Sequence, residues 1–209
     1  MNLAVFGAAG KTGQLLATLA LSKSHSITAL VRSPGKFVVQ SHRLRVVQGD
    51  IGEAEKVSQT VAGADAVISV LGPTSNRPEL AVSRGMDNIL AAMRQHGVRR
   101  LVVSIGAGVR DTHDKPTVVH ALFGILVRLL SRNVYADMVR VDQAVRKSEV
   151  DWTLIRVPRL VDGPKTGRIR VGYVGADIGW QLSRADLAEF MLSQVADETY
   201  IRQAPAVSG

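Results

Sequence analysis

Six short apolar segments alternate along this chain with longer amphipathic ones, and this alternation limits the possible folds more than any other feature. The apolar segments occupy residues 3–7, 27–31, 44–50, 64–72, 100–106 and 151–157. They are rich in valine, isoleucine and leucine and almost continuously apolar, which is typical of strands covered on both faces. Strand–helix alternation of this kind predicts a doubly wound parallel sheet between two layers of helices.

The helices are expected between these strands and after the last of them, at 11–22, 53–61, 79–96, 118–131, 135–149 and 184–196. Within 79–96, for example, Met86, Ile89 and Met93 recur at helical spacing. Residues 198–207 should add one more strand at an edge of the sheet. The chain has 209 residues, is 46% hydrophobic and contains no long linker or internal repeat. We therefore expect a single α/β domain of the Rossmann type, with three α/β/α layers over residues 1–209.

Composition narrows the classes of function. The chain has no cysteine, which excludes disulfides, thiolate metal sites and thiol nucleophiles, and no metal centre is expected. The net charge of +8 favours anionic ligands. The basic residues are scattered, however, and only 4% of the residues are aromatic, so nucleic acid is not an expected partner. The first residues already resemble a strand, with no leader before it, so a cytoplasmic protein is expected.

The stretch GAAGKTG, residues 7–13, follows the first predicted strand and opens the first predicted helix. A phosphate-binding P-loop would need glycine at position 5, where this chain has valine. A dinucleotide-binding turn instead uses Gly7 for the tight turn, Gly10 for close approach of a pyrophosphate, and Gly13 for packing of the helix on the sheet. The pyrophosphate would lie at the positive end of the helix. The loop therefore predicts a dinucleotide site.

The end of the second predicted strand indicates which dinucleotide is bound. An acidic residue about 20 positions beyond the glycines would hold the ribose of NAD, whereas an arginine suits the 2′-phosphate of NADP. This chain has Arg32, Ser33 and Lys36 there, and no carboxylate in the segment. The planar guanidinium of Arg32 presents several donors to a phosphate. NADP is the predicted cofactor, in preference to NAD; a solvated basic turn is the alternative.

Five longer segments carry a family resemblance. They are FGAAGKTG, LVRSPGK, VVQGDIGEAEKVSQTVAGADAVISVLG, SRGMDNILAAMRQHGVRRLVVSIGAG and VDWTLIRVPRLVDG. Together they resemble the NAD(P)H-binding, atypical short-chain dehydrogenases, a group that includes flavin reductases of the biliverdin reductase B type and the NmrA-like proteins. The resemblance covers residue 1 to roughly residue 195 and is strongest over the first 106 residues. It implies NADP bound in an extended groove.

The same resemblance implies a place for each part of the cofactor. The pyrophosphate would lie against Gly7, Ala9, Gly10, Lys11, Thr12 and Gly13, and the 2′-phosphate against Arg32, Ser33 and Lys36. Asp50 and Ile51 would flank the adenine, Leu71 and Gly72 the middle of the cofactor, and Ser104, Ile105 and Gly106 the nicotinamide. For Asp50, a role as a helix cap or turn residue before segment 53–61 is the alternative.

The catalytic pair of the short-chain dehydrogenases is missing. That pair is Tyr-x-x-x-Lys, and Tyr135, on a suitable predicted helix, is followed four residues later by Val139. Biliverdin reductase B also lacks the pair, so the resemblance implies a reduction that depends on hydride geometry and a serine after the fifth strand. Gly106 stands in the place of that serine, and Ser104 lies two residues earlier. Ser104 and Tyr135 are therefore the catalytic candidates; a hydrogen bond to backbone is the alternative for Ser104.

Four further positions are polar or conformationally constrained. Arg156 and Pro158 resemble a T-x-x-R-P element that lies beside the cofactor in related proteins, although Val157 intervenes here. Both are expected to contact cofactor or substrate, with snorkelling to the surface as the alternative for Arg156. Asp142 is expected on a solvated helix face. His113 lies in a polar loop, either at the mouth of the site or in solvent.

The most apolar stretch is VVHALFGILVRLL, residues 118–130. Its 13 residues are too few to span a bilayer, which needs about 20, so no membrane is expected. We expect instead a helix over the substrate pocket, in a covering region made of 107–135 and 157–182, or a contact with a second subunit. The protein would be a monomer or a homodimer. The polar loop 73–78 would form a rim or lid of the site, with an ordinary surface loop as the alternative.

Two functions remain. The first is an NADPH-dependent reductase that acts on a small, conjugated acceptor, anionic or aromatic, of the flavin, bilin or quinone type, because such acceptors delocalise charge and need few catalytic groups. The second is an NmrA-like protein that senses the redox state of NADP without turnover. Roughly 50 residues follow the sixth predicted strand, which leaves little room for a partner-binding domain. This length favours the reductase.

Overall fold

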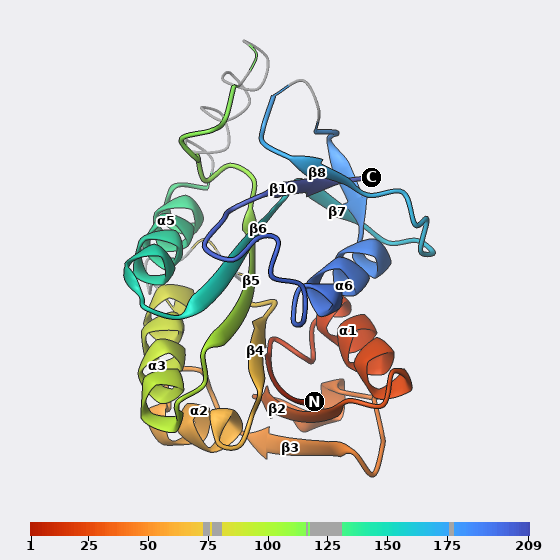
Figure 1. Ribbon diagram of the computed structural model, residues 1–209. Coiled ribbons are helices and arrows are strands. Elements are labelled where there is room, and N and C mark those ends of the chain that lie inside the picture. Colours follow the sequence, from red (N-terminus) through yellow and green to blue (C-terminus); the bar gives the residue numbers. More distant parts are fainter. Residues whose placement is uncertain (73–75, 77–80, 116, 118–130, 176–177) are drawn as a thin grey trace.

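Eight strands form one sheet at the centre of the protein, in a computed structural model that describes residues 1–72, 76, 81–115, 117, 131–175 and 178–209 (Figure 1). The strands lie in the order β3-β2-β1-β4-β5-β6-β10-β8. Their bounds are β1 Asn2–Phe6, β2 Ser26–Val31, β3 Leu44–Gln48, β4 Ala66–Ser69, β5 Arg100–Gly106, β6 Asp151–Val157, β8 Arg170–Gly172 and β10 Ala206–Ser208. Neighbouring strands are parallel except for β8, which is antiparallel to β10. The doubly wound Rossmann-type sheet is confirmed.

The C-terminal strand departs from the prediction. We expected it at an edge of the sheet, but β10 lies between β6 and β8. The edge is β8, a strand of three residues with one exposed arginine, which has no apolar run that the sequence analysis could detect. A separate parallel pair, β7 Arg159–Val161 and β9 Gln181–Ser183, was also missed.

Helices cover both faces of the sheet (Figure 1). Helices α1 Lys11–Ser22 and α6 Arg184–Ser193 lie on one face, and α2 Ala54–Val61, α3 Ala81–His96 and α5 Arg132–Lys147 lie on the other. A short 3-10 helix, η1 Pro34–Lys36, follows β2. The bounds of these five α-helices agree with the predicted ones to within three residues where described. Almost all of the helix predicted at 118–131 lies outside the described residues.

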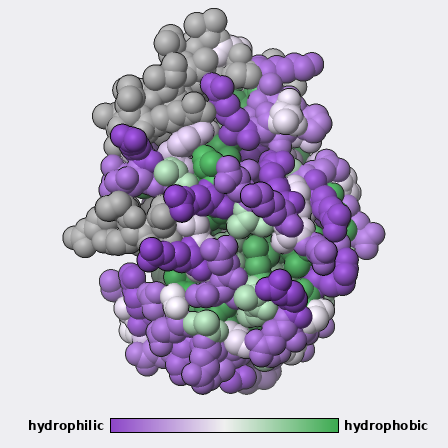
Figure 2. All heavy atoms as spheres, turned by 90° about the vertical axis from the view of Figure 1, so that its left-hand side faces the viewer, coloured by the Kyte–Doolittle hydropathy of each residue, from purple (hydrophilic) through white to green (hydrophobic). Residues whose placement is uncertain are grey.

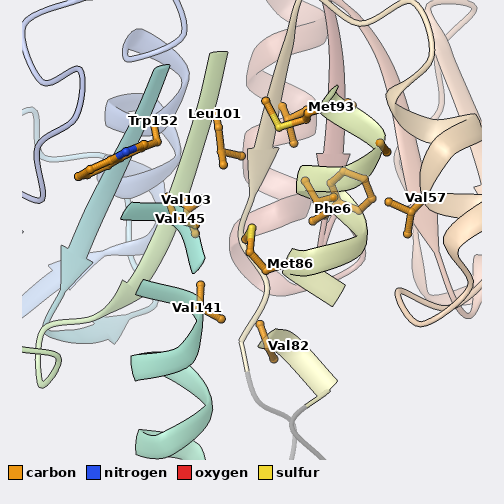
Figure 3. Close-up of a cluster of buried hydrophobic side chains, with 14 of the residues drawn as sticks. Phe6, Val57, Val82, Met86, Met93, Leu101, Val103, Val141, Val145 and Trp152 are labelled. Carbon is orange, nitrogen blue, oxygen red and sulfur yellow. The ribbon is translucent and has the colours of Figure 1, made fainter. Parts of the chain in front are cut away.

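Two apolar clusters fill the spaces between the layers. One joins the sheet to α2, α3 and α5 and includes Phe6, Val57, Met86, Leu101, Val141 and Trp152 (Figure 3). The other joins the sheet to α1 and α6 and includes Leu3, Leu16, Ile27, Ile68, Leu187 and Met191. Successive strand residues point to opposite faces, so a strand with both faces covered must be apolar throughout. This explains the continuous apolar runs in the sequence.

The outer surface is polar where the helices cover the sheet. Figure 2 looks onto the side that carries α2, α3 and α5, and most of the described surface there is hydrophilic. Within the described part of the chain, no helix has both the length and the apolar character that crossing a membrane requires. The apolar stretch 118–130 lies outside the described residues.

The turns after β1 and β4 meet where the strand order reverses. From β1 the chain builds outward to β2 and β3, then crosses back to β4 on the other side of β1. Gly7 adopts φ +82°, and a Cβ atom there would lie 2.8 Å from the carbonyl oxygen of Val70. Doubly wound sheets bind ligands in the crevice at such a reversal, beyond the carboxyl ends of the strands. The fold therefore places the candidate site around Gly7 and Val70.

Replacing Gly13 by alanine tests how closely α1 approaches this turn. A Cβ atom on Gly13 would lie 2.1 Å from the oxygen of Gly7 and 2.7 Å from the Cα atom of Ala8. Both are backbone atoms, so α1 or the turn must move, and we expect Gly13→Ala to lower the free energy of unfolding by at least about 2 kcal/mol. Urea denaturation measures this loss.

The matched control is Gly35→Ala, because a Cβ atom there meets nothing within 4 Å. It should change the free energy of unfolding by less than about 0.5 kcal/mol. Equal effects of the two substitutions would show that the approach of α1 to the turn imposes no steric constraint.

Candidate functional site

The N-terminus of α1 presents unpaired backbone N–H groups to the crevice. Gly10 is the N-cap residue, and because it has no side chain it supplies no capping acceptor. The Gly10 N–H closes the turn by donating to the oxygen of Gly7 at 3.0 Å. No acceptor among the described residues pairs with the N–H groups of Lys11, Thr12 or Gly13. Unpaired N–H groups and the positive end of the helix dipole form an anion site, so these residues fit a pyrophosphate.

The Lys11 side chain is engaged elsewhere. Its Nζ atom lies 2.7 Å from the carboxylate of Asp162, which also pairs with Arg184 at 2.7 Å. The hydrogen bond from Lys11, together with the charge of Arg184, holds the pKa of Asp162 below its usual value. Lys11 therefore joins the glycine loop to the loop after β7. A contact of its ammonium group with the pyrophosphate stays a prediction.

The basic residues after β2 are all exposed at the same end of the sheet. Ser33 is the N-cap of η1 without a side-chain capping bond, and Lys36 ends η1. Although segment 32–36 contains no carboxylate, Asp50 from the end of β3 lies 3.7 Å from Nη1 of Arg32. The two side chains are 71% and 48% exposed, so this ion pair is weak. Because β2 and β3 are parallel neighbours, their ends bring together residues that are distant in the sequence.

Asp50 also stabilises its own turn. Its Oδ1 atom accepts a hydrogen bond from the N–H of Gly52 at 3.0 Å, and Glu53 rather than Asp50 is the N-cap residue of α2. This contact matches the turn role that we gave as the alternative for Asp50. Its predicted contact with the adenine stays a prediction.

Two residues of α3 hold the neighbouring Ile51. A Cβ atom on Gly85 would lie 2.1 Å from Cγ1 of Ile51, so α3 packs directly on this side chain. Asn88 donates from Nδ2 to the oxygen of Ile51 at 2.9 Å. Both residues were missed, because nothing in the local sequence of α3 indicates contacts with a turn more than 30 positions earlier. They fix the turn to which the sequence assigns the adenine.

The ends of β4 and β5 leave open space. Leu71 is half-buried, whereas Gly72 and Gly106 are exposed. A Cβ atom on either glycine would meet no described atom within 4 Å. The position of the nicotinamide beside these strand ends stays a prediction. Most of the loop expected to form the rim, 73–75 and 77–78, lies outside the described residues.

The two catalytic candidates lie near the same end of the sheet, on β5 and on the first turn of α5. Ser104 is half-buried, and no hydrogen bond of its hydroxyl is found among the described residues. The alternative role given for Ser104, a hydrogen bond from this hydroxyl to the backbone, is therefore not seen among them. Ile105 is buried. Tyr135 is half-buried, four residues into α5. The catalytic roles of Ser104 and Tyr135 stay predictions.

Arg156 occupies a buried ion pair. Its guanidinium forms two hydrogen bonds of 2.7 Å with the carboxylate of Asp114. It also donates to the backbone oxygens of Ala204 at 2.8 Å and Val109 at 3.2 Å. Arg156 is fully buried, so the snorkelling alternative is wrong. These contacts hold the loop after β5 against β6; contacts of Arg156 and Pro158 with the cofactor or substrate stay predictions.

A second carboxylate anchors the same loop to α5. Asp111 pairs with Arg146 at 2.7 Å and accepts hydrogen bonds from the backbone and ring of His113. Arg146 also pairs with Asp142, which is buried, so the expectation of a solvated Asp142 is wrong. The side chain of His113 is exposed and its ring lies 4.8 Å from that of Tyr173. Whether His113 lies at the mouth of the site stays a prediction.

The fold and the anion site at α1 define a dinucleotide-binding protein of the Rossmann class. Residues 7–198 match the family model described as NAD(P)H-binding. The chain therefore belongs to the NAD(P)H-binding family, and the resemblance found in the sequence is confirmed. The glycine loop and the ends of β2 and β5 all lie within the matched residues.

Individual relatives are distant. Oxidoreductase aflX of Aspergillus parasiticus is 26% identical over 182 residues, which cover 78% of this chain and 67% of aflX. Among solved structures, a short-chain dehydrogenase/reductase from Veillonella parvula in complex with NADP has a TM-score of 0.82 at 22% identity, covering 100% of this chain and 94% of that one. ChuY, an anaerobillin reductase from Escherichia coli, has a TM-score of 0.78 at 17% identity, covering 100% and 97%. At these identities the structural likeness shows the fold.

The stability of the protein should depend on the ionisation of Asp111. Burial alone would raise the pKa of this carboxyl, but the hydrogen bonds from His113 and Arg146 outweigh burial and lower the pKa from 3.8 to about 2. A group with a lowered folded-state pKa stabilises the fold above its unfolded pKa and loses that contribution as the pH falls through the folded one. The shift corresponds to about 2 kcal/mol.

We therefore expect Asp111→Asn to lower the free energy of unfolding by about 2 kcal/mol at neutral pH, with the difference from the wild type shrinking between pH 5 and pH 2. Urea denaturation across this range measures it. Asp87→Asn, at an exposed carboxylate on α3, is the control and should have little effect at any pH. A difference for Asp111→Asn that does not change with pH would contradict the assignment.

Proposed function

We propose that the protein is an NADPH-dependent reductase that passes hydride to a small conjugated acceptor of the flavin, bilin or quinone type. The observation that carries the cofactor preference is the exposed group of Arg32, Ser33 and Lys36 at the end of β2. Among the described residues, the guanidinium of Arg32 has one partner, a long, exposed ion pair with Asp50 that a phosphate would displace. The NADP complex of the Veillonella parvula protein supports the same kind of cofactor.

The chain's own residues would bind and orient the cofactor. The N–H groups at the start of α1 would hold the pyrophosphate, and Arg32 with its neighbours the 2′-phosphate. The open space beside Gly72 and Gly106 would receive the nicotinamide ring. When bound, NADPH supplies the hydride. The protein contributes position and exclusion of water, which suits a chain without a Tyr-x-x-x-Lys pair.

The acceptor class follows from the sparse set of catalytic groups. A conjugated acceptor spreads the added charge over its ring system and takes its proton from water, so it needs no strong acid from the protein. Both aflX, an oxidoreductase, and ChuY, an anaerobillin reductase, support a redox role. Segments 107–135 and 157–182 would cover the acceptor, although 118–130 lies outside the described residues.

A panel of acceptors tests the reaction. FMN, riboflavin, biliverdin and several quinones are each mixed with NADPH and the protein, and the loss of NADPH absorbance is followed. Turnover of any of them supports a reductase, and their ranking describes the pocket. Tight NADPH binding without turnover would contradict the reductase and favour a sensor of the NmrA-like type.

Arg32→Ala tests the cofactor preference. Loss of a charge-assisted contact to the 2′-phosphate should raise the Kd of NADPH about tenfold to hundredfold and leave that of NADH within about twofold. Fluorescence titration measures both constants. Arg45→Ala, which removes an exposed arginine from β3, controls for the general effect of charge. Equal affinity for NADPH and NADH in the wild type would overturn the preference.

Ser104→Ala tests the hydroxyl at the end of β5. If this hydroxyl donates to the acceptor or to the nicotinamide carboxamide, its loss should lower kcat about tenfold. The Kd of NADPH should stay within about twofold, because the phosphate contacts are unchanged. Steady-state kinetics with the best acceptor, together with the same titration, separates the two effects. An unchanged kcat would remove Ser104 from the catalytic candidates.

A further inference from the structure

The side chain of Gln14 joins the two loops to which the proposed function assigns the phosphates of the cofactor. Gln14 lies in the first turn of α1, one residue after the last glycine of the loop. Its Nε2 atom donates to the oxygen of Ala9 in the glycine loop at 3.1 Å. The same atom donates to the oxygen of Lys36 in η1 at 3.3 Å. One amide group thus connects the glycine loop, assigned to the pyrophosphate, with the turn assigned to the 2′-phosphate.

The basic turn 33–38 has few other attachments. Its remaining hydrogen bonds are internal, from the Lys36 N–H to Ser33 and from the Phe37 N–H to Pro34. Phe37 anchors the turn in the apolar cluster beneath α1. Among the described contacts, the bond from Gln14 is the one hydrogen bond that connects this turn to the rest of the protein. Without it, only the Phe37 side chain and the chain ends would hold the turn.

Packing does not replace this hydrogen bond on the outer side of the turn. Gln14, Leu15 and Val38 line an open groove of about 730 Å³ between α1, the turn and the loop after β7. Val38 is 73% exposed and Leu15 is 42% exposed. The side of the turn that faces α1 is therefore open to solvent, and a polar tether there has no apolar substitute.

The other end of the tether is rigid. The glycine loop is closed by the hydrogen bond from Gly10 to Gly7, and Gly13 packs against its backbone. Ala9 is consequently fixed by contacts that do not involve Gln14. Because the glycine loop is fixed, the hydrogen bonds of the Gln14 amide restrict the movement of the turn relative to that loop.

From this geometry we propose that Gln14 is a positioning residue that holds the basic turn in register for a 2′-phosphate, and so helps to set the preference for NADP over NAD. The inference rests on the proposed function, because it assumes that Ser33 and Lys36 meet that phosphate. Gln14 itself need not touch the cofactor. Its contribution is to reduce the ordering of the turn that binding would otherwise require.

The test uses two fragments of the cofactor that differ only in the 2′-phosphate. Gln14→Met keeps the length of the side chain and removes both donors. Calorimetric titration should show the Kd of 2′,5′-ADP rising about fivefold to tenfold, with that of 5′-AMP within about twofold. Amide hydrogen exchange at Lys36 and Phe37 should become faster in the free variant. Gln59→Met, on the surface of α2, is the matched control and should change neither Kd.

The possible outcomes separate the inference from the function on which it rests. If the wild type binds both fragments equally, the NADP preference fails and the inference fails with it. If the wild type prefers 2′,5′-ADP and Gln14→Met keeps the same preference, the inference alone is overturned. An equal loss for both fragments also overturns it, because Gln14 would then support the glycine loop and not the turn.

Discussion

The approach of α1 to the turn after β1 is the contact on which the rest of the site depends. Gly13 lies so close to the backbone of Gly7 and Ala8 that a single added carbon would overlap it. This approach places the start of the helix directly over the crevice between β1 and β4. Because the N–H groups of Lys11, Thr12 and Gly13 have no partner among the described residues, the same contact creates the anion site. The close packing of α1 on the turn and the anion site at its N-terminus therefore have the same structural cause.

Polar side chains from distant segments then hold the loops around this fixed point. Arg156 and Asp114 pin the loop after β5 to β6, and Asn88 holds the turn after β3. The ion pair is buried, so removal of either partner would leave an uncompensated charge in the interior. This supporting ion pair is thus buried, whereas the side chains assigned to the 2′-phosphate, those of Arg32, Ser33 and Lys36, are exposed.

Local sequence patterns were sufficient to predict the fold and part of the candidate site. The strands from β1 to β6 and their helices follow from apolar runs and helical spacing, and GAAGKTG followed from its place between a strand and a helix. The short strand β8 has no such pattern and was missed, which misplaced β10. Asp142 was misjudged because its burial depends on how α5 packs against the rest of the protein, which local sequence does not record, although its partner Arg146 lies only four residues away. Gln14, Asn88 and Asp114 were missed for the same reason: each acts across a long interval of sequence.

Under the proposed function, the weak pairing of Arg32 with Asp50 would let the guanidinium exchange a carboxylate for a phosphate. At 3.7 Å and with both side chains largely exposed, the pair contributes little to stability, about 0–1 kcal/mol for pairs of this kind. A 2′-phosphate offers Arg32 two or three acceptor oxygens in place of one distant carboxylate, so exchange of partners favours the phosphate. The carboxylate of Asp50 meanwhile retains its bond to Gly52, so the turn after β3 keeps its shape when Arg32 changes partner.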